Sequence, residues 1–209
     1  MPRGWGMPLL KSAGLLCVLL FSYSHAGAAV GPQELVEATS NKMLERLRAE
    51  QKALKQNPQL IYDMVSDIVL PHFDFIAMSR SVLGKHWRTA DLDGKKRFVL
   101  AFRDTLVRTY AVALLEYTEQ KVRYLPLRDD PATKDVTVWT EIIESGKAPI
   151  SIKYSLHLKK DQWKVYDVSV DGVSLIANYR TSFASEVTKT GLNALIERLE
   201  QHNRKAGLK

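Results

Sequence analysis

His72 and Asp74 come closest to a reactive pair, either as two metal ligands or as a base with the acid that orients it. They lie two positions apart, and neither a helix nor a strand would bring a third ligand near them. Asp63 and Asp67 lie one helical turn apart, a spacing more typical of a solvated helix face than of acid and base catalysis. We therefore expect no catalytic residue and no metal site.

Motifs that carry chemistry on their own are also missing from the sequence. There is no glycine loop that could cradle phosphates, no Gly-x-Ser-x-Gly elbow and no His-Glu-x-x-His zinc helix. The basic residues behind the net charge of +7 are scattered among acidic ones, which argues against a nucleic-acid partner. With 209 residues, 45% of them hydrophobic, the chain has the apolar material for one globular core.

The N-terminus predicts a secretory signal peptide. Basic residues flank an apolar stretch at 13–21, which is shorter than the roughly 20 residues that span a bilayer, and small residues follow at 26–29. We expect residues 1–28 to be cleaved and residues 29–209 to form a single domain. The only cysteine, Cys17, lies in the removed segment, and an exported chain without a disulfide suits the bacterial periplasm.

Most of the remaining chain has the apolar period of helices. We expect a helix opening at Gly31-Pro32, a second from Asn57-Pro58 to just before Pro71, and a short helix that Gly84 closes before a loop. The longest helix is expected at 97–117, and two more follow Gly172, separated by Gly191. The apolar arc of the longest helix is wide and includes Arg103, so this helix contacts several neighbours or lines a cavity.

Between these helices the apolar period changes to two, which indicates strands. We expect strands at 121–127, 135–144, 150–158 and 162–170, joined by short turns into an antiparallel meander. In the last strand the apolar residues change face, which predicts a bulge near Tyr166-Asp167. The fold class is therefore α+β, with about four strands packed against several helices.

One family resemblance is carried by the segment 163–183, WKVYDVSVDGVSLIANYRTSF. It combines a strand, an Asp-Gly-Val-Ser turn and a helix with Tyr179, Arg180 and Phe183. Together with segment 69–90 and the Phe98, Phe102, Arg103 and Tyr110 pattern, it makes the chain resemble the MlaC family, periplasmic phospholipid-binding proteins also described as toluene-tolerance auxiliary components.

The resemblance implies a soluble, monomeric periplasmic lipid carrier whose helices and sheet enclose an apolar lipid cavity. Such a carrier is not expected to be an enzyme or to use a cofactor, since the bound phospholipid is its cargo. Such a carrier shuttles phospholipid between an outer-membrane lipoprotein complex and an inner-membrane MCE-domain ABC transporter complex, which maintains outer-membrane lipid asymmetry. Each buried methylene is worth about 0.8 kcal/mol, so two acyl chains of about 30 methylenes cost on the order of 24 kcal/mol to leave in water. Only an enclosed apolar cavity makes such a cargo portable.

We expect three walls for this cavity: the buried sheet face, the longest helix and segment 173–183. Ordinary core packing is the alternative for every residue assigned to them. The residues expected to contact acyl chains are Phe102, Leu106, Tyr110, Tyr154, Leu156, Val173, Leu175, Tyr179 and Phe183. Arg103 and Arg180 are candidates for headgroup binding or structural ion pairing.

Two other functions stay open at this point. A secreted lipid-acting hydrolase would use a nucleophile with a base within reach. A ligand-free adaptor protein would bind its partner through the basic surface.

Overall fold

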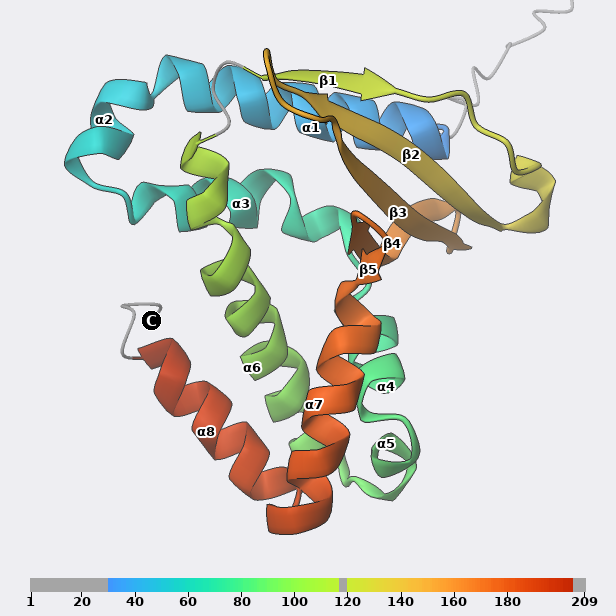
Figure 1. Ribbon diagram of the computed structural model, residues 1–209. Helices are drawn as coiled ribbons and strands as arrows, with labels where there is room; N and C mark the ends of the chain where they lie inside the picture. The colour runs from blue at the N-terminus through green and yellow to red at the C-terminus, as the bar shows by residue number, and fades with distance from the viewer. Residues whose placement is uncertain (1–29, 117–119, 205–209) are drawn as a thin grey trace, which may run out of the picture.

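Figure 1 presents the computed structural model of the chain, which describes residues 30–116 and 120–204. The sheet lies at one end with α1 along it, and α6, α7 and α8 extend away from the sheet toward the other end. The expected α+β class is confirmed. The predicted signal peptide and the last residue of the predicted longest helix, Tyr117, lie outside the described residues.

Helices form wherever the sequence predicts them, and some boundaries differ. A short helix follows Gly84 where we expected a loop, and that expectation is wrong. The longest helix begins at Leu92, because the Asp91 carboxylate caps it by accepting a hydrogen bond from the Gly94 N–H at 2.7 Å. The α-helices are α1 (Pro32–Ala49), α2 (Gln51–Gln56), α3 (Leu60–Ile68), α4 (Phe75–Leu83), α5 (Lys85–Thr89), α6 (Leu92–Tyr110), α7 (Leu175–Thr190) and α8 (Leu192–Arg204). The 3-10 turns are η1 (Leu70–His72), η2 (Val112–Glu116) and η3 (Pro131–Thr133).

The sheet is an antiparallel meander in which each strand pairs with the next one along the chain. The four predicted strands are present, and a fifth strand of two residues follows them. The predicted bulge is confirmed: Ser155 lies opposite Asp167 and Leu156 opposite Val165, which leaves Tyr166 as the extra residue. The strands are β1 (Lys121–Tyr124), β2 (Asp135–Ile143), β3 (Ile150–Lys159), β4 (Gln162–Val170) and β5 (Val173–Ser174).

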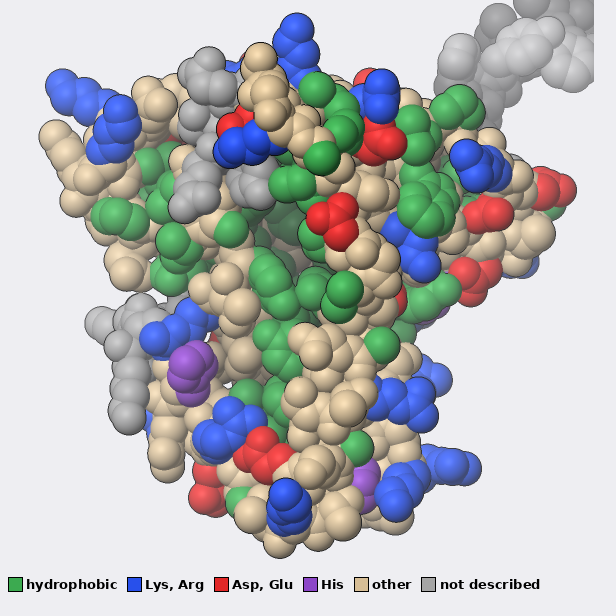
Figure 2. Space-filling model, viewed as in Figure 1, with side chains coloured by type: hydrophobic (Ala, Val, Ile, Leu, Met, Phe, Trp, Pro, Cys, Tyr) green, Lys and Arg blue, Asp and Glu red, His purple; other side chains and the backbone are tan. Residues whose placement is uncertain are grey.

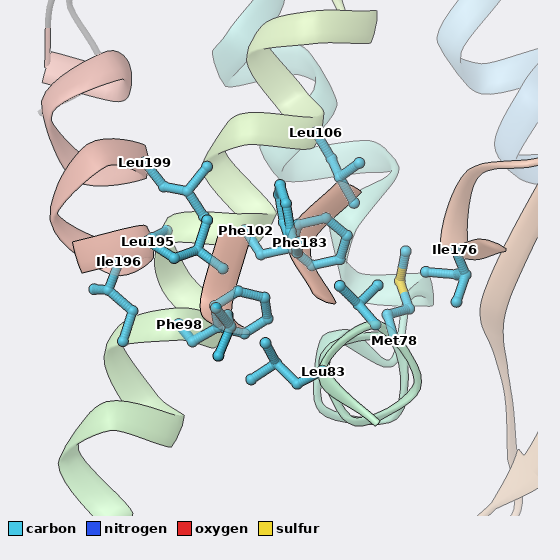
Figure 3. Close-up of a cluster of buried hydrophobic side chains, with 13 residues drawn as sticks. Met78, Leu83, Phe98, Phe102, Leu106, Ile176, Phe183, Leu195, Ile196 and Leu199 are labelled. Atoms are coloured by element: carbon cyan, nitrogen blue, oxygen red, sulfur yellow. The ribbon is translucent and has the colours of Figure 1, made fainter. Parts of the chain in front are cut away.

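Buried clusters of apolar side chains stabilise each end of the molecule. Where α6 and α7 meet, Phe98 stacks on Phe102 with ring centroids 5.7 Å apart, and the edge of Phe183 contacts both rings (Figure 3). Leucine and isoleucine side chains of α8 complete this helical cluster. At the other end, Val36 of α1 packs on one face of the sheet, against Leu156 and its neighbours. We call this the inner face of the sheet.

Candidate functional site

The turn between β4 and α7 fixes the position of the segment that carries the family resemblance. Asp171 and Gly172 both have positive φ values, 46° and 82°, which suits a tight two-residue turn. The Asp167 carboxylate accepts hydrogen bonds from the Ser174 hydroxyl at 2.6 Å and from the Ile176 N–H at 3.2 Å. Ser174 also caps α7 by accepting a backbone hydrogen bond. The motif therefore anchors the start of α7 to the end of the sheet.

The inner face of the sheet is covered by α1 at one end only. The register of the strands places one residue from every strand in a single row across this face. The row consists of Tyr124, Thr140, Ile152, Val170 and Val173. Tyr124 lies under α1, where its hydroxyl donates to Asn41 at 3.4 Å. Val170 and Val173, at the far end of the row, are 37% and 60% exposed. The inner face thus leaves apolar surface uncovered beside α7.

The end of α6 leaves apolar surface uncovered as well. Tyr110 and Val112 are 38% and 47% exposed. The half-buried Tyr179 of α7 lies between this surface and the core, because its ring centroid is 5.2 Å from that of Phe102. Burial and the neighbouring Tyr179 hydroxyl raise the pKa of Tyr110 to about 12. The two tyrosines therefore link α6 to α7.

The contact between Tyr110 and Tyr179 joins the end of α6 to α7, and α7 begins directly after the strand that carries Val173. We call the region between these surfaces the apolar hollow and define it by Tyr110, Val112, Val170, Val173 and Tyr179. Figure 2 shows hydrophobic side chains gathered around a depression between the sheet and the helices α6 and α7. Monomers rarely expose large apolar side chains together, and a group of them marks a ligand-binding groove or an interface. Apart from the two phenols, the five defining residues have no ionisable group. The arrangement suits an apolar ligand.

Five of the predicted contact residues lie at or near the apolar hollow. Tyr110, Val173 and Tyr179 help to define it, and Leu175 is half-buried in the first turn of α7. Tyr154 is half-buried on the inner face, next to the row that ends at the hollow, and burial raises its pKa.

Four other predicted contact residues are packed against protein. Phe102, Leu106 and Phe183 belong to the helical cluster, and Leu156 belongs to the cluster under α1. Each is buried, and the ring of Phe102 has no exposed surface. Their assignment as acyl-chain contacts stays a prediction, because the structure shows only that they are buried among protein side chains.

The two predicted arginines lie elsewhere. Arg103 pairs with Asp104 at 2.7 Å and borders a separate hollow of about 700 Å³ between α3 and α6. Arg180 is exposed and its guanidinium lies beside Gly84, where an added Cβ atom would be 3.6 Å from the Arg180 Nη2 atom. Arg103 thus makes a structural ion pair, whereas Arg180 has no ion pair within residues 30–116 and 120–204.

Sequence reasoning did not select Val112 or Val170 as site residues. Val112 falls in the 3-10 turn after α6, where helical periodicity no longer predicts direction. The signal for Val170 was present in the bulge: the extra residue, Tyr166, turns Val170 back to the inner face, the face of Val165.

His72 and Asp74 do not form the metal-binding or acid–base pair that the sequence analysis considered. The Asp74 carboxylate instead accepts a hydrogen bond from Lys159 and contacts His157. In the part of the chain that the structure describes, no group of three or more His, Cys, Asp or Glu residues could hold a metal ion. No helix of those residues is long and apolar enough to cross a membrane.

Comparisons with known proteins place the chain in a family. It is 25% identical over 83% of its length, and 83% of the relative, to the "Intermembrane phospholipid transport system binding protein MlaC" of Haemophilus influenzae. It is 30% identical over 85% of its length, and 83% of the relative, to the "Toluene tolerance protein ttg2D" of Pseudomonas putida. A phospholipid-binding protein from Ralstonia solanacearum, solved in complex with a phospholipid, superposes with a TM-score of 0.77 at 26% identity, covering 84% of this chain and 98% of that one. The profile of the MlaC protein family matches residues 37–201, and the chain therefore belongs to the MlaC family.

Proposed function

We propose that this protein binds the acyl chains of a phospholipid in the apolar hollow and carries the lipid between membranes. The observation that carries the proposal is the hollow itself, which is bordered by four exposed apolar side chains from β4, β5 and the end of α6. Relatives that are named for phospholipid transport, or solved with a bound phospholipid, support a lipid as the ligand.

Binding by an apolar hollow also suits the energetics of lipid transfer. The free energy of leaving two acyl chains in water, on the order of 24 kcal/mol, makes unassisted release slow. Loading and unloading therefore require partners that open or match the hollow. We propose that these partners are an outer-membrane lipoprotein complex and an inner-membrane MCE-domain ABC transporter complex, and that the transfer maintains outer-membrane lipid asymmetry.

Several finer features belong to the same proposal. The signal peptide, residues 1–28, directs the chain to the periplasm, where residues 29–209 act as one monomeric domain. The protein is not an enzyme and uses no cofactor, since the phospholipid is cargo. The apolar lining favours this over a hydrolase, because the raised pKa of Tyr110 makes its phenol a poor base at neutral pH.

The experiment is to purify the protein without detergent and to measure bound lipid by native mass spectrometry. Val170→Glu and Val173→Glu place a carboxylate on the wall of the hollow, where acyl chains would desolvate it. We expect each to lower phospholipid content at least about tenfold, because burying an unpaired charge costs several kcal/mol. The matched control is Leu92→Glu, which puts the same charge on an exposed leucine at the start of α6.

The outcomes separate the alternatives. Wild-type protein that repeatedly carries no phospholipid would contradict the proposal and favour a ligand-free adaptor. Release of free fatty acid from phospholipid by the purified protein would favour the hydrolase. Equal lipid content in the control and in both hollow variants would show that the lipid binds elsewhere.

A further inference from the structure

A second depression, outside the apolar hollow, lies where the start of α4 meets the turn between β3 and β4. It encloses about 330 Å³ and has an apolar floor, because the Phe73 and Phe75 rings stack with centroids 5.8 Å apart. Ile76 lies beside them with half of its surface exposed. We call this depression the α4 pocket; its lining residues are Phe73, Asp74, Phe75, Ile76, Lys159, Lys160, Gln162 and Lys164.

Ionic and backbone contacts hold the α4 pocket in shape. The buried Asp74 carboxylate accepts hydrogen bonds from the Lys159 ammonium at 2.5 Å and from the Ala77 N–H at 3.0 Å, and it contacts His157 at 3.1 Å. The Asp74 N–H donates to the carbonyl oxygen of Val165 at 2.8 Å. These contacts join α4 to β3 and β4, so the pocket walls belong to fixed elements of the fold.

The border of the α4 pocket is basic. Lys160 and Lys164 line it, and Arg80 is exposed one helical turn after Ile76. The Lys164 ammonium donates a hydrogen bond to the backbone carbonyl of Pro71 at 2.7 Å, which holds it at this border. Asp161 lies in the adjacent turn and offsets one of these charges, whereas the Asp74 carboxylate is already paired with Lys159. An excess of positive charge therefore surrounds an apolar floor.

We propose that the α4 pocket is a docking site for an acidic segment of a partner protein, which inserts one apolar side chain between the lysines. The depression is at the small end of the roughly 300 to 1,000 Å³ that ligand pockets occupy, which suits a single side chain. Its concave shape favours a peptide over a membrane, because membrane-binding surfaces project apolar side chains outward into the lipid. The basic border supplies charge complementarity and faster encounter with an acidic partner.

The test uses a synthetic peptide, Asp-Glu-Asp-Leu-Glu-Asp, and a matched peptide in which alanine replaces the leucine. Binding to the full mature protein is measured by fluorescence polarisation and mapped by amide chemical shifts. We expect shifts confined to residues 73–80 and 159–164, and affinity at least about tenfold weaker for Ile76→Glu, for Lys160→Glu and for the alanine peptide. Leu92→Glu and Lys189→Glu, which make the same changes at exposed positions elsewhere, should bind as the wild type does.

Three results would overturn the proposal. The first is absence of binding by the leucine peptide, and the second is binding that Ile76→Glu and Lys160→Glu leave unchanged. The third is binding of vesicles containing phosphatidylglycerol through these residues in place of the peptide, which would identify a membrane-contact surface. Phospholipid content and thermal unfolding of each variant are measured in parallel. Unchanged lipid content shows that the α4 pocket acts separately from the apolar hollow, so this proposal and the proposed function fail independently.

Discussion

Leu106 and Tyr110 lie one turn apart on α6, and the boundary between the core and the apolar hollow falls between them. Leu106 is 8% exposed and belongs to the helical cluster, whereas Tyr110 is 38% exposed and helps to define the hollow. Replacing each with tryptophan tests this boundary, because added volume has opposite consequences in a packed core and in an open cavity.

The two variants should separate stability from lipid binding. Leu106→Trp replaces a leucine side chain with a bulky indole among Phe102 and its neighbours. Overpacking of this kind destabilises the folded protein by about 1 to 3 kcal/mol. Tyr110→Trp adds volume at a partly exposed position, where substitutions usually change the free energy of unfolding by less than about 0.5 kcal/mol. It should nevertheless exclude lipid, because the indole occupies part of the hollow.

The assay is chemical unfolding of delipidated wild type and variants, beside phospholipid content after detergent-free purification. Loss of stability for Tyr110→Trp with unchanged lipid content would refute the placement of Tyr110 in the hollow. Unchanged stability for Leu106→Trp with little bound lipid would instead support the sequence-based assignment of Leu106 to the acyl-chain wall. It would contradict the boundary drawn from burial.

Three further predictions concern stability. The pKa of Tyr110 is raised in the folded state, so the unfolded chain loses this proton first as the pH rises above 10, and wild type should lose stability toward pH 12 more steeply than Tyr110→Phe. Gly84 has φ 54° and ψ −118°, a backbone conformation that side chains with a Cβ atom rarely adopt, so Gly84→Ala should lower the free energy of unfolding by about 1 to 3 kcal/mol. Gly84→Asn should lower it by a similar amount. Unchanged stability of both variants in a denaturant titration would refute the strain. Burial tends to raise the pKa of Asp74, but its hydrogen bonds with Lys159, the Ala77 N–H and His157 outweigh this and lower the pKa below 3.8. Asp74→Asn should therefore cost about 1.5 to 3 kcal/mol at neutral pH, a difference that disappears as the pH falls below about 4 and that a pH series of urea titrations measures.

Periodicity predicted most of the elements because their faces are defined locally. The alternation in 150–158 requires a strand with one buried face, and the four-residue repeat from Leu175 to Val187 requires a helix with one buried stripe. The phase change in β4 even predicted the bulge at Tyr166. The helix after Gly84 was missed, because a five-residue helix has too few positions to show a period.

The candidate site was predictable only in part. Sequence patterns identify Phe102, Leu156 and Phe183 as apolar and inward-facing, which holds equally for a core and for a cavity wall. Tertiary structure distinguishes the two, because it shows which neighbours cover each side chain: Phe183 covers Phe102, and Val36 lies in the cluster that buries Leu156.

The sequence by itself determined the α+β order of elements, the faces that must be buried and the likeness to the MlaC family. Each of these depends on residues close together in the chain. Tertiary structure decided that Val170, Val173 and Tyr110 are left exposed, and that Asp74 binds Lys159 and not His72. Such contacts join elements far apart in the chain, and only the packing of the helices on one another and on the sheet brings them together.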